Sequence, residues 1–217
     1  MTQPAGALSL FATLRQDADR SARGPRELGG LADVQLVALA REDRPAALEA
    51  MYHAYKGRIY TFLLRFLADV EMADDVTQDT FTKAYSALGS LTPSHRVLPW
   101  LYRIATNTAL DHIRRRRRFR WIHMTSIADT PEEPQMQDEH GRVPEREHIQ
   151  AVLRGLPPEN AIALLLHAVE GYSYTEIAEI QNVTMTAVRS RIARARASFR
   201  RAYGQAAEGG AGGDQPA

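Results

Sequence analysis

Arginine is concentrated in two short stretches of this 217-residue chain. Residues 114–120 contain six arginines and no acidic residue, and residues 189–201 contain six more, again without an acid. The formal net charge is only +1, so the remainder of the chain is acidic. Guanidinium groups form paired hydrogen bonds with phosphates and with guanine edges. Two separate cationic stretches therefore predict two contacts with a polyanion, for which nucleic acid fits best.

Acidic side chains gather on one face of a helix predicted over residues 72–88. At about 100° per residue, the polar side chains fall within one arc and the apolar ones occupy the other side. The polar residues of this arc are Asp74, Asp75, Gln78, Asp79 and Thr82, of which the first four are the candidates for contact with a partner. Gly89 follows, where it can end the helix. This face is too acidic to contact DNA, so it either docks on a protein partner or remains solvated.

The second arginine stretch follows a segment with the local chemistry of a helix-turn-helix. Ser173 and Glu176 have the spacing of a capping box, which predicts that a helix begins directly after Ser173. Asn182 tolerates the left-handed conformation that a tight turn requires, and Thr184 can cap the next helix. In that next helix, Val188 and Ile192 are expected to be buried. The pattern predicts two short helices joined by a tight turn.

The second of these helices presents its polar residues in the manner of a helix that enters the DNA major groove. We predict that it contacts DNA through Arg189, Ser190, Arg191, Arg194 and Arg196. Two residues depart from the usual pattern, because Gln181 occupies a normally apolar position and Asn182 replaces glycine. The alternative interpretation is an exposed basic helix that binds no nucleic acid.

The spacing of the apolar residues predicts an all-α protein, because it is helical and no useful alternation of period two occurs. Two small helical domains are expected, at residues 31–119 and 145–203. The segment between them, 120–144, is acidic and contains prolines, which is typical of a flexible linker. The ends, 1–30 and 204–217, are rich in small residues and are expected to be disordered tails.

Composition excludes several other classes of protein. The chain has no cysteine, so it forms neither disulfides nor thiolate metal sites. Its longest apolar run, at residues 161–166, is far shorter than the roughly 20 residues that span a bilayer. Its first residues lack the features of a secretory signal, so a cytoplasmic location is expected. No catalytic motif is present, and we expect a protein that is not an enzyme and holds no cofactor or metal.

Taken together, these segments resemble a bacterial sigma factor of the extracytoplasmic-function (ECF) group. Three motifs carry the resemblance: Asp-Asp-Val-Thr-Gln-Asp-Thr-Phe at 74–81, Trp-Leu-Tyr-Arg-Ile-Ala-Thr-Asn at 100–107, and the helix-turn-helix from Gly171 to Arg196. The resemblance covers about 33–119 and 145–203. It implies a region 2 helical bundle followed by a region 4 helix-turn-helix.

The resemblance also implies a role for each surface. The acidic face would dock on core RNA polymerase, and the helix-turn-helix would read the −35 promoter element. The loop at 89–99 and the helix after it would melt and hold the −10 element, with a flipped base in a pocket formed partly by the loop. Side chains available in this loop are Ser90, Thr92, Ser94, His95 and Arg96. The residues assigned to the −10 element and its backbone are Ser90, Arg96, Asn107, Arg114, Arg115 and Arg118.

The implied partners are core RNA polymerase, promoter DNA and an anti-sigma factor. Two other functions stay open at this point. A stand-alone helix-turn-helix regulator would bind DNA without polymerase, but it needs neither the acidic helix nor the 100–107 motif. A sigma-like decoy would bind an anti-sigma factor and no DNA, but it does not need twelve clustered arginines.

Overall fold

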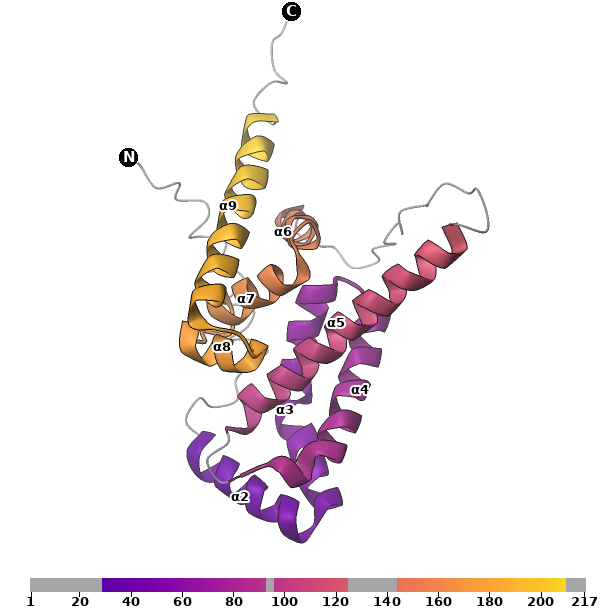
Figure 1. Ribbon diagram of the computed structural model, residues 1–217, viewed down its shortest axis with the longest axis vertical. Helices are drawn as coiled ribbons and strands as arrows, with labels where there is room; N and C mark the ends of the chain where they lie inside the picture. Colours follow the sequence, from indigo (N-terminus) through magenta and orange to yellow (C-terminus); the bar gives the residue numbers. More distant parts are fainter. Residues whose placement is uncertain (1–28, 93–95, 125–143, 210–217) are drawn as a thin grey trace, which may run out of the picture.

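The protein is built from helices. The computed structural model describes residues 29–92, 96–124 and 144–209. The elements are α2 (Gly29–Glu42), α3 (Arg44–Leu67), α4 (Val70–Ala87), the 3-10 helix η1 (Leu88–Ser90), α5 (Val97–Met124), α6 (Pro144–Arg154), α7 (Pro158–Ala168), α8 (Tyr174–Gln181) and α9 (Met185–Gly209) (Figure 1). No strand occurs within these described ranges, and the predicted all-α fold is confirmed.

The helices reach beyond the predicted domain bounds. α5 continues to Met124 and α6 begins at Pro144, so both enter the ends of the segment predicted as a linker. α9 continues to Gly209, into the predicted C-terminal tail, and α2 begins at Gly29. The other residues of the predicted tails and linker lie outside the described residues.

Aspartate caps set the beginnings of the two helices that carry most of the N-terminal core. Asp43 accepts a hydrogen bond from the Ala46 amide at 3.0 Å, and Pro45 lies in the first turn of α3. Asp69 accepts from the Met72 amide, also at 3.0 Å, at the start of α4. Each cap satisfies an amide that has no partner inside its helix. These caps separate three helices within one long region of helical spacing.

The N-terminal domain has its core between α3, α4 and α5, with α2 packed across α3 (Figure 1). Its largest fully buried side chains include Met51, Phe62, Leu101 and Tyr102. The rings of Phe62 and Tyr102 meet edge to face, with centroids 5.0 Å apart. α5 begins at Val97, whereas the sequence analysis predicted a loop up to residue 99. Pro99 does not prevent the earlier start, because it lies in the first turn of the helix, where its missing amide proton is not needed.

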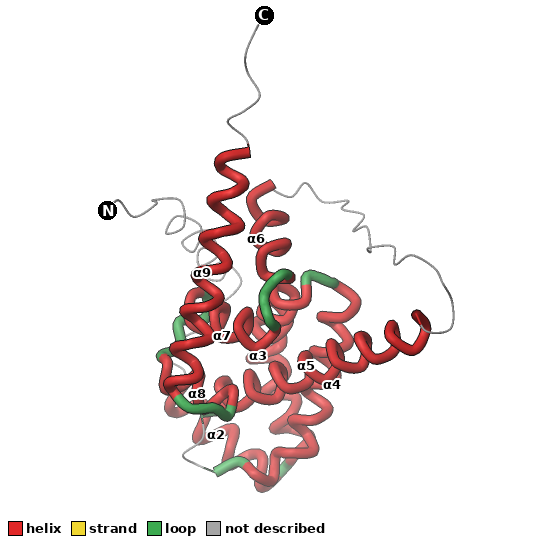
Figure 2. The backbone as a smooth tube through the Cα atoms, turned by 45° about the horizontal axis from the view of Figure 1, so that its top comes forward, coloured by secondary structure: helices red, strands yellow, loops and turns green. Residues whose placement is uncertain are grey.

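The C-terminal domain, α6 to α9, is centred on α7. All residues from Asn160 to Leu166 of this helix are buried, on every side. A helix that is apolar all round must pack on more than one face. α7 contacts α8 and α9 in its own domain and also α3 of the N-terminal domain, while α8 contacts α5. The two domains therefore lie against each other, as the tube view shows (Figure 2).

Candidate nucleic-acid interface

α8 and α9 form the predicted helix-turn-helix. The Ser173 hydroxyl accepts from the Glu176 amide at 3.3 Å, and the Glu176 carboxylate accepts from the Ser173 amide at 2.9 Å. This capping box is the predicted one. Asn182 has φ 52° and ψ 52°, the left-handed conformation expected in the turn. The Thr184 hydroxyl accepts from the Ala187 amide at 3.2 Å, so the predicted cap of the next helix is also confirmed.

α9 turns one face to the core and the opposite face to solvent. Val188 and Ile192 are buried, as predicted, against α7 and α8. Four of the five predicted DNA-contacting side chains are exposed, namely Arg189, Ser190, Arg194 and Arg196. The fifth, Arg191, is half-buried on the flank of the helix. The exposed set can reach a groove or a phosphate without rearrangement of the domain.

Gln181 explains why Arg191 differs. Arg191 Nη1 donates to Gln181 Oε1 at 2.9 Å, and Gln181 Nε2 donates to the carbonyl of Glu159 at 3.0 Å. The amide therefore links α7, α8 and α9. An apolar side chain at this position would leave the Arg191 guanidinium without this acceptor. The departure from the usual apolar residue thus fixes the direction of one cation of α9.

The acidic face of α4 is solvent-accessible. Asp74, Asp75 and Gln78 are exposed, and Asp79 is half-exposed. On the opposite side, the buried hydroxyls of Thr77 and Thr80 each donate to a carbonyl one turn earlier at 2.6 Å. The predicted division of this helix into a polar and a buried face is correct.

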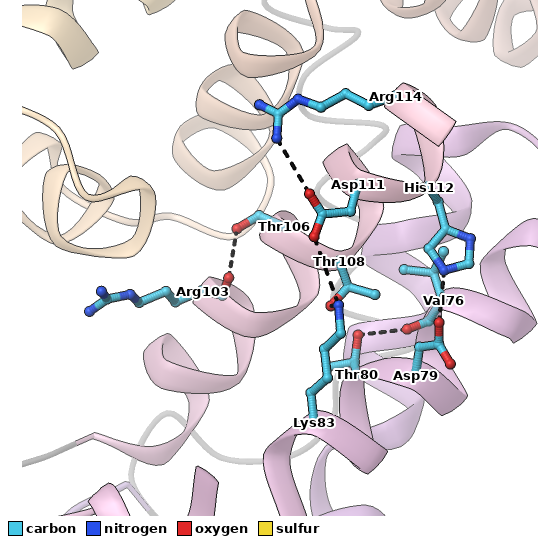
Figure 3. Close-up of polar contacts among 10 residues, drawn as sticks. All are labelled: Val76, Asp79, Thr80, Lys83, Arg103, Thr106, Thr108, Asp111, His112 and Arg114. Atoms are coloured by element: carbon cyan, nitrogen blue, oxygen red, sulfur yellow. Dashed lines mark hydrogen bonds and ion pairs between the residues drawn. The ribbon is translucent and has the colours of Figure 1, made fainter. Parts of the chain in front are cut away.

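A polar network holds α4 against α5 (Figure 3). His112 Nε2 donates to Asp79 Oδ2 at 2.8 Å. Lys83 Nζ donates to Thr108 Oγ1 at 3.1 Å and lies 3.9 Å from Asp111 Oδ2. The network fixes the acidic face relative to the cationic surface of α5. Asp79 is therefore a structural contact as well as a member of the acidic face.

The residues predicted to contact the −10 element lie in η1, directly before α5 and along α5. Ser90 Oγ donates to the carbonyl of Ala87 at 2.7 Å, which ends α4. The remaining predicted residues are exposed: Arg96, Asn107, Arg114, Arg115 and Arg118. Arg96 and Arg114 are engaged by carboxylates, as described below. The structure describes Thr92 of the predicted loop as exposed, whereas Ser94 and His95 lie outside the described residues.

Comparison with known families decides what these two domains are. The family model for sigma-70 region 2 matches residues 51–119, and the model for sigma-70 region 4 matches residues 146–199. The RNA polymerase sigma-H factor of Pseudomonas aeruginosa is 32% identical over 184 residues, which cover 78% of this chain and 93% of the relative. This chain belongs to the sigma-70 family.

The similarity extends to other sigma factors and to solved structures. The ECF sigma factor SigW of Bacillus subtilis is 31% identical over 68% of this chain and 83% of the relative. A structure of CnrH in complex with the cytosolic domain of CnrY aligns with a TM-score of 0.58 and 27% identity, over 77% of this chain and 94% of CnrH. The chain is thus an ECF sigma factor, which binds core RNA polymerase and directs transcription from promoters.

The structure also places a buried carboxylate between the two sigma domains. Glu170, two residues after the end of α7, has a side chain that is only 4% exposed. Its carboxylate accepts from Tyr102 Oη at 2.7 Å and from Arg58 Nε at 3.2 Å, and it lies 3.8 Å from Arg65 Nη1. Burial raises the pKa of the Tyr102 phenol well above its usual value, and the Glu170 charge acts in the same direction. Tyr102 therefore remains a hydrogen-bond donor.

Two further carboxylates of region 4 reach region 2. Glu176 of α8 forms an ion pair with Arg96, and Glu159 of α7 lies 3.8 Å from Arg114 Nη2. Burial acts to raise the pKa of Glu176, but hydrogen bonds from Ser173 and the Arg96 ion pair outweigh it and lower the pKa. Glu176 thus has two tasks, because it closes the capping box and also holds Arg96.

Sequence analysis missed this contact between the domains. The missed residues are Arg58, Arg65, Tyr102, Glu159 and Glu170, together with the second role of Glu176. One signal was present, because the uninterrupted apolar run at 161–166 is too wide for a helix with a single buried face. That run predicts a second partner for α7, although it does not identify α3 as that partner.

Two further properties concern the described part of the chain. None of its helices has the length and apolar character needed to traverse a bilayer. No three histidine, cysteine or acidic side chains in that part come together as a set that could hold a metal ion.

Proposed function

We propose that this sigma factor distributes its tasks over three surfaces. The acidic face of α4, formed by Asp74, Asp75, Gln78 and Asp79, docks on core RNA polymerase. The surface of η1 and α5 holds the −10 element and its backbone through Ser90, Arg96, Asn107, Arg114, Arg115 and Arg118. The exposed side of α9 reads the −35 element through Arg189, Ser190, Arg194 and Arg196, with Arg191 held by Gln181 at its flank.

The observation that carries this proposal is the separation of charge between different helices. α4 exposes carboxylates, whereas α5 and α9 expose arginines. Each cationic surface suits a polyanion, and the acidic surface suits a basic protein partner. A stand-alone regulator needs only the helix-turn-helix of α8 and α9, so the acidic face of α4 favours the sigma factor.

The domain limits and the cellular setting follow from the same proposal. We assign 31–119 to region 2, 120–144 to the linker and 145–203 to region 4, with tails at 1–30 and 204–217. The protein works in the cytoplasm, where bacterial RNA polymerase meets the chromosome. It is not itself an enzyme, because the catalysis of RNA synthesis belongs to the polymerase.

An anti-sigma factor is the third proposed partner. One solved neighbour, RpoE of Bartonella quintana, is in complex with the anti-sigma factor NepR, and it aligns with a TM-score of 0.57 and 20% identity over 71% of this chain and 95% of RpoE. At that identity the likeness supports the fold. The proposal of an anti-sigma partner therefore rests on membership of the ECF group, and pull-downs from the native host test it.

Reconstituted transcription tests the proposed function directly. Purified protein and sigma-free core polymerase are incubated with a genomic promoter library, and the start sites are sequenced. Specific starts that share two spaced elements support the proposal. Core binding without any start would instead indicate a decoy. DNA binding without core binding or starts would indicate a stand-alone regulator.

A further inference from the structure

We propose that Asp33 of α2 is a positioning residue for recognition of the −10 element. Its carboxylate holds the first turn of α5 in place, and with it Arg96, the residue directly before that helix. The inference rests on the proposed assignment of Ser90 and Arg96 to promoter contact. Asp33 acts through these residues and does not reach DNA itself, because it is only 6% exposed.

The residue directly before α5 cannot cap this helix with its side chain. The first amides of a helix have no partner inside it, and a serine, threonine, aspartate or asparagine at this position usually accepts from them. Here the position is occupied by Arg96, whose carbonyl accepts the first helical bond from the Trp100 amide at 3.3 Å. A guanidinium group has no acceptor atom. An acceptor other than the Arg96 side chain is therefore needed.

Asp33 supplies an acceptor from a different helix. Its carboxylate accepts a hydrogen bond from the backbone amide of Val97, the first residue of α5. A carboxylate at a helix N-terminus also interacts favourably with the helix dipole. Val97 is 0% exposed, so water cannot replace the carboxylate. Removal of the Asp33 side chain would thus leave a buried amide without its partner, which destabilises the first turn of α5.

Tyr55 fixes the orientation of this carboxylate. Tyr55 Oη of α3 donates to Asp33 Oδ1 at 3.2 Å. Burial raises the pKa of Asp33, although the Val97 amide, the Tyr55 hydroxyl and the charge of Arg96 act in the opposite direction. Burial and the Asp33 charge raise the pKa of Tyr55 to about 12, so Tyr55 remains a donor. Three helices, α2, α3 and α5, therefore meet at one carboxylate.

α2 also contacts the other end of the loop that precedes α5. Its contacts extend to η1 as well as to α5. Leu88 and Leu91 are buried where the chain leaves η1, and Val97 is buried where the chain enters α5. Both ends of the loop are thus anchored in the core beside one helix. Ser90 and Arg96 are exposed directly next to these anchors, so α2 sets where the two side chains lie.

Three variants separate positioning from general stability. Asp33→Ala removes the acceptor, whereas Asp33→Asn keeps an amide oxygen at the same place. Asp43→Ala is the matched control, because Asp43 caps α3 by accepting from the Ala46 amide at 3.0 Å. It removes a cap of the same chemical type from a different helix of region 2. Circular dichroism verifies that each variant is folded at the assay temperature.

Hydrogen exchange of the free protein tests the contact itself. In Asp33→Ala, the amides in the first turn of α5 should exchange about tenfold faster than in the parent, and in Asp33→Asn within about threefold of it. Asp43→Ala should accelerate exchange at the start of α3 and leave α5 unchanged. Unchanged exchange at α5 in Asp33→Ala would overturn the proposal, and so would equal acceleration there in Asp43→Ala.

Transcription with core polymerase tests the consequence for the promoter. The probes are a promoter recovered with the parent protein and versions of it altered at single positions of the −10 or the −35 element. In Asp33→Ala, the preference for the recovered −10 sequence should fall about tenfold, and the preference at the −35 element should stay within about twofold of the parent. Asp33→Asn should restore most of the −10 preference, and Asp43→Ala should retain both preferences.

The outcomes distinguish a positioning role from a structural one. If Asp33→Ala lowered initiation equally for all versions of the promoter, Asp33 would only stabilise region 2 and the proposal would be wrong. The same conclusion would follow if Asp43→Ala lost as much −10 preference as Asp33→Ala. Failure of the parent to initiate would instead count against the proposed function, because the hydrogen-exchange measurement needs neither promoter nor polymerase.

Discussion

The two surfaces proposed to bind DNA hold their arginines in different ways. On α9, Arg189 and Arg196 are exposed, and within the described residues no carboxylate forms an ion pair with that helix. Arg96, directly before α5, pairs with Glu176, whereas Arg114 and Arg116 of α5 pair with Glu159 and with Asp69, the residue that caps α4. The surface proposed to read the −35 element thus has its cations free of counter-charge, whereas cations of the surface proposed to hold the −10 element already have carboxylate partners within the protein. Similar residue types therefore give one surface with unpaired cations and one whose cations are partly neutralised by the protein itself.

Reversing the charge of α4 should have the largest effect. In Asp74→Arg/Asp75→Arg, the acidic face repels the basic partner that it is proposed to bind, so transcription with core polymerase should fall by about 100-fold. DNA binding by the free protein should not weaken, because both DNA-binding surfaces are intact. Core binding by gel filtration and DNA binding by fluorescence anisotropy separate the two effects. A parallel loss of DNA binding would show that α4 is not a separate surface.

Single arginine substitutions should distinguish the kind of DNA contact made by α9 from the kind made by α5. Arg189→Ala should cost about 1–3 kcal/mol of binding free energy and relax the preference at one position of the −35 element. Arg115→Ala should weaken binding about equally for all sequences and reduce the salt dependence by about one phosphate contact. Competition among promoter variants at several salt concentrations measures both. If the two variants behaved alike, the distinction between sequence-specific contact by α9 and sequence-independent phosphate contact by α5 would be wrong.

A smaller effect is expected when Gln181 becomes leucine, the more usual kind of residue at that position. Gln181→Leu removes the acceptor that orients Arg191, and we expect a loss of about 1 kcal/mol in binding to the −35 element. Gln181→Glu is the matched variant, since a carboxylate still accepts from Arg191 and should preserve most of the affinity. If both variants lost the same affinity together with thermal stability, Gln181 would have only a packing role.

The smallest expected effect concerns pH. The pKa of Glu176 is lowered from its ordinary value of 4.5, so its ionised form stabilises the folded protein. That contribution is complete above pH 4.5 and is lost as the pH falls through the lowered pKa. Urea unfolding at pH 6 and below pH 4.5 should show less acid sensitivity in Glu176→Gln. Unchanged acid sensitivity would assign the effect to other carboxylates, such as Asp69, whose pKa is also lowered.

The local elements could be predicted because their signals are short in range. Ser173 with Glu176, and Asn182 in the turn, act within one helical turn of themselves, and each takes the predicted geometry. The polar and buried faces of α4 follow from its period alone. Wherever the physical cause lies within a few residues, the sequence pattern is sufficient.

The contact between the domains could not be predicted, because its partners are far apart in sequence. Glu170 lies 112 residues from Arg58 and 68 from Tyr102, so no periodicity connects them. Gln181 departs from the usual apolar residue in the sequence, but its link to Arg191 depends on how α8 packs on α9. Such pairings require the tertiary structure.

The length of α5 has a consequence for the surface proposed to hold the −10 element. This helix of 28 residues is one continuous rod of about 42 Å. Its beginning, next to Arg96, and Arg118 near its other end are about 33 Å apart, which is close to one turn of the double helix. The helical rise alone therefore sets the spacing of these side chains, because no loop interrupts the helix between them. One inserted residue between them would turn every later arginine by about 100° around the helix axis. The charges would all remain, but the arginines after the insertion would no longer face the same side as Arg96.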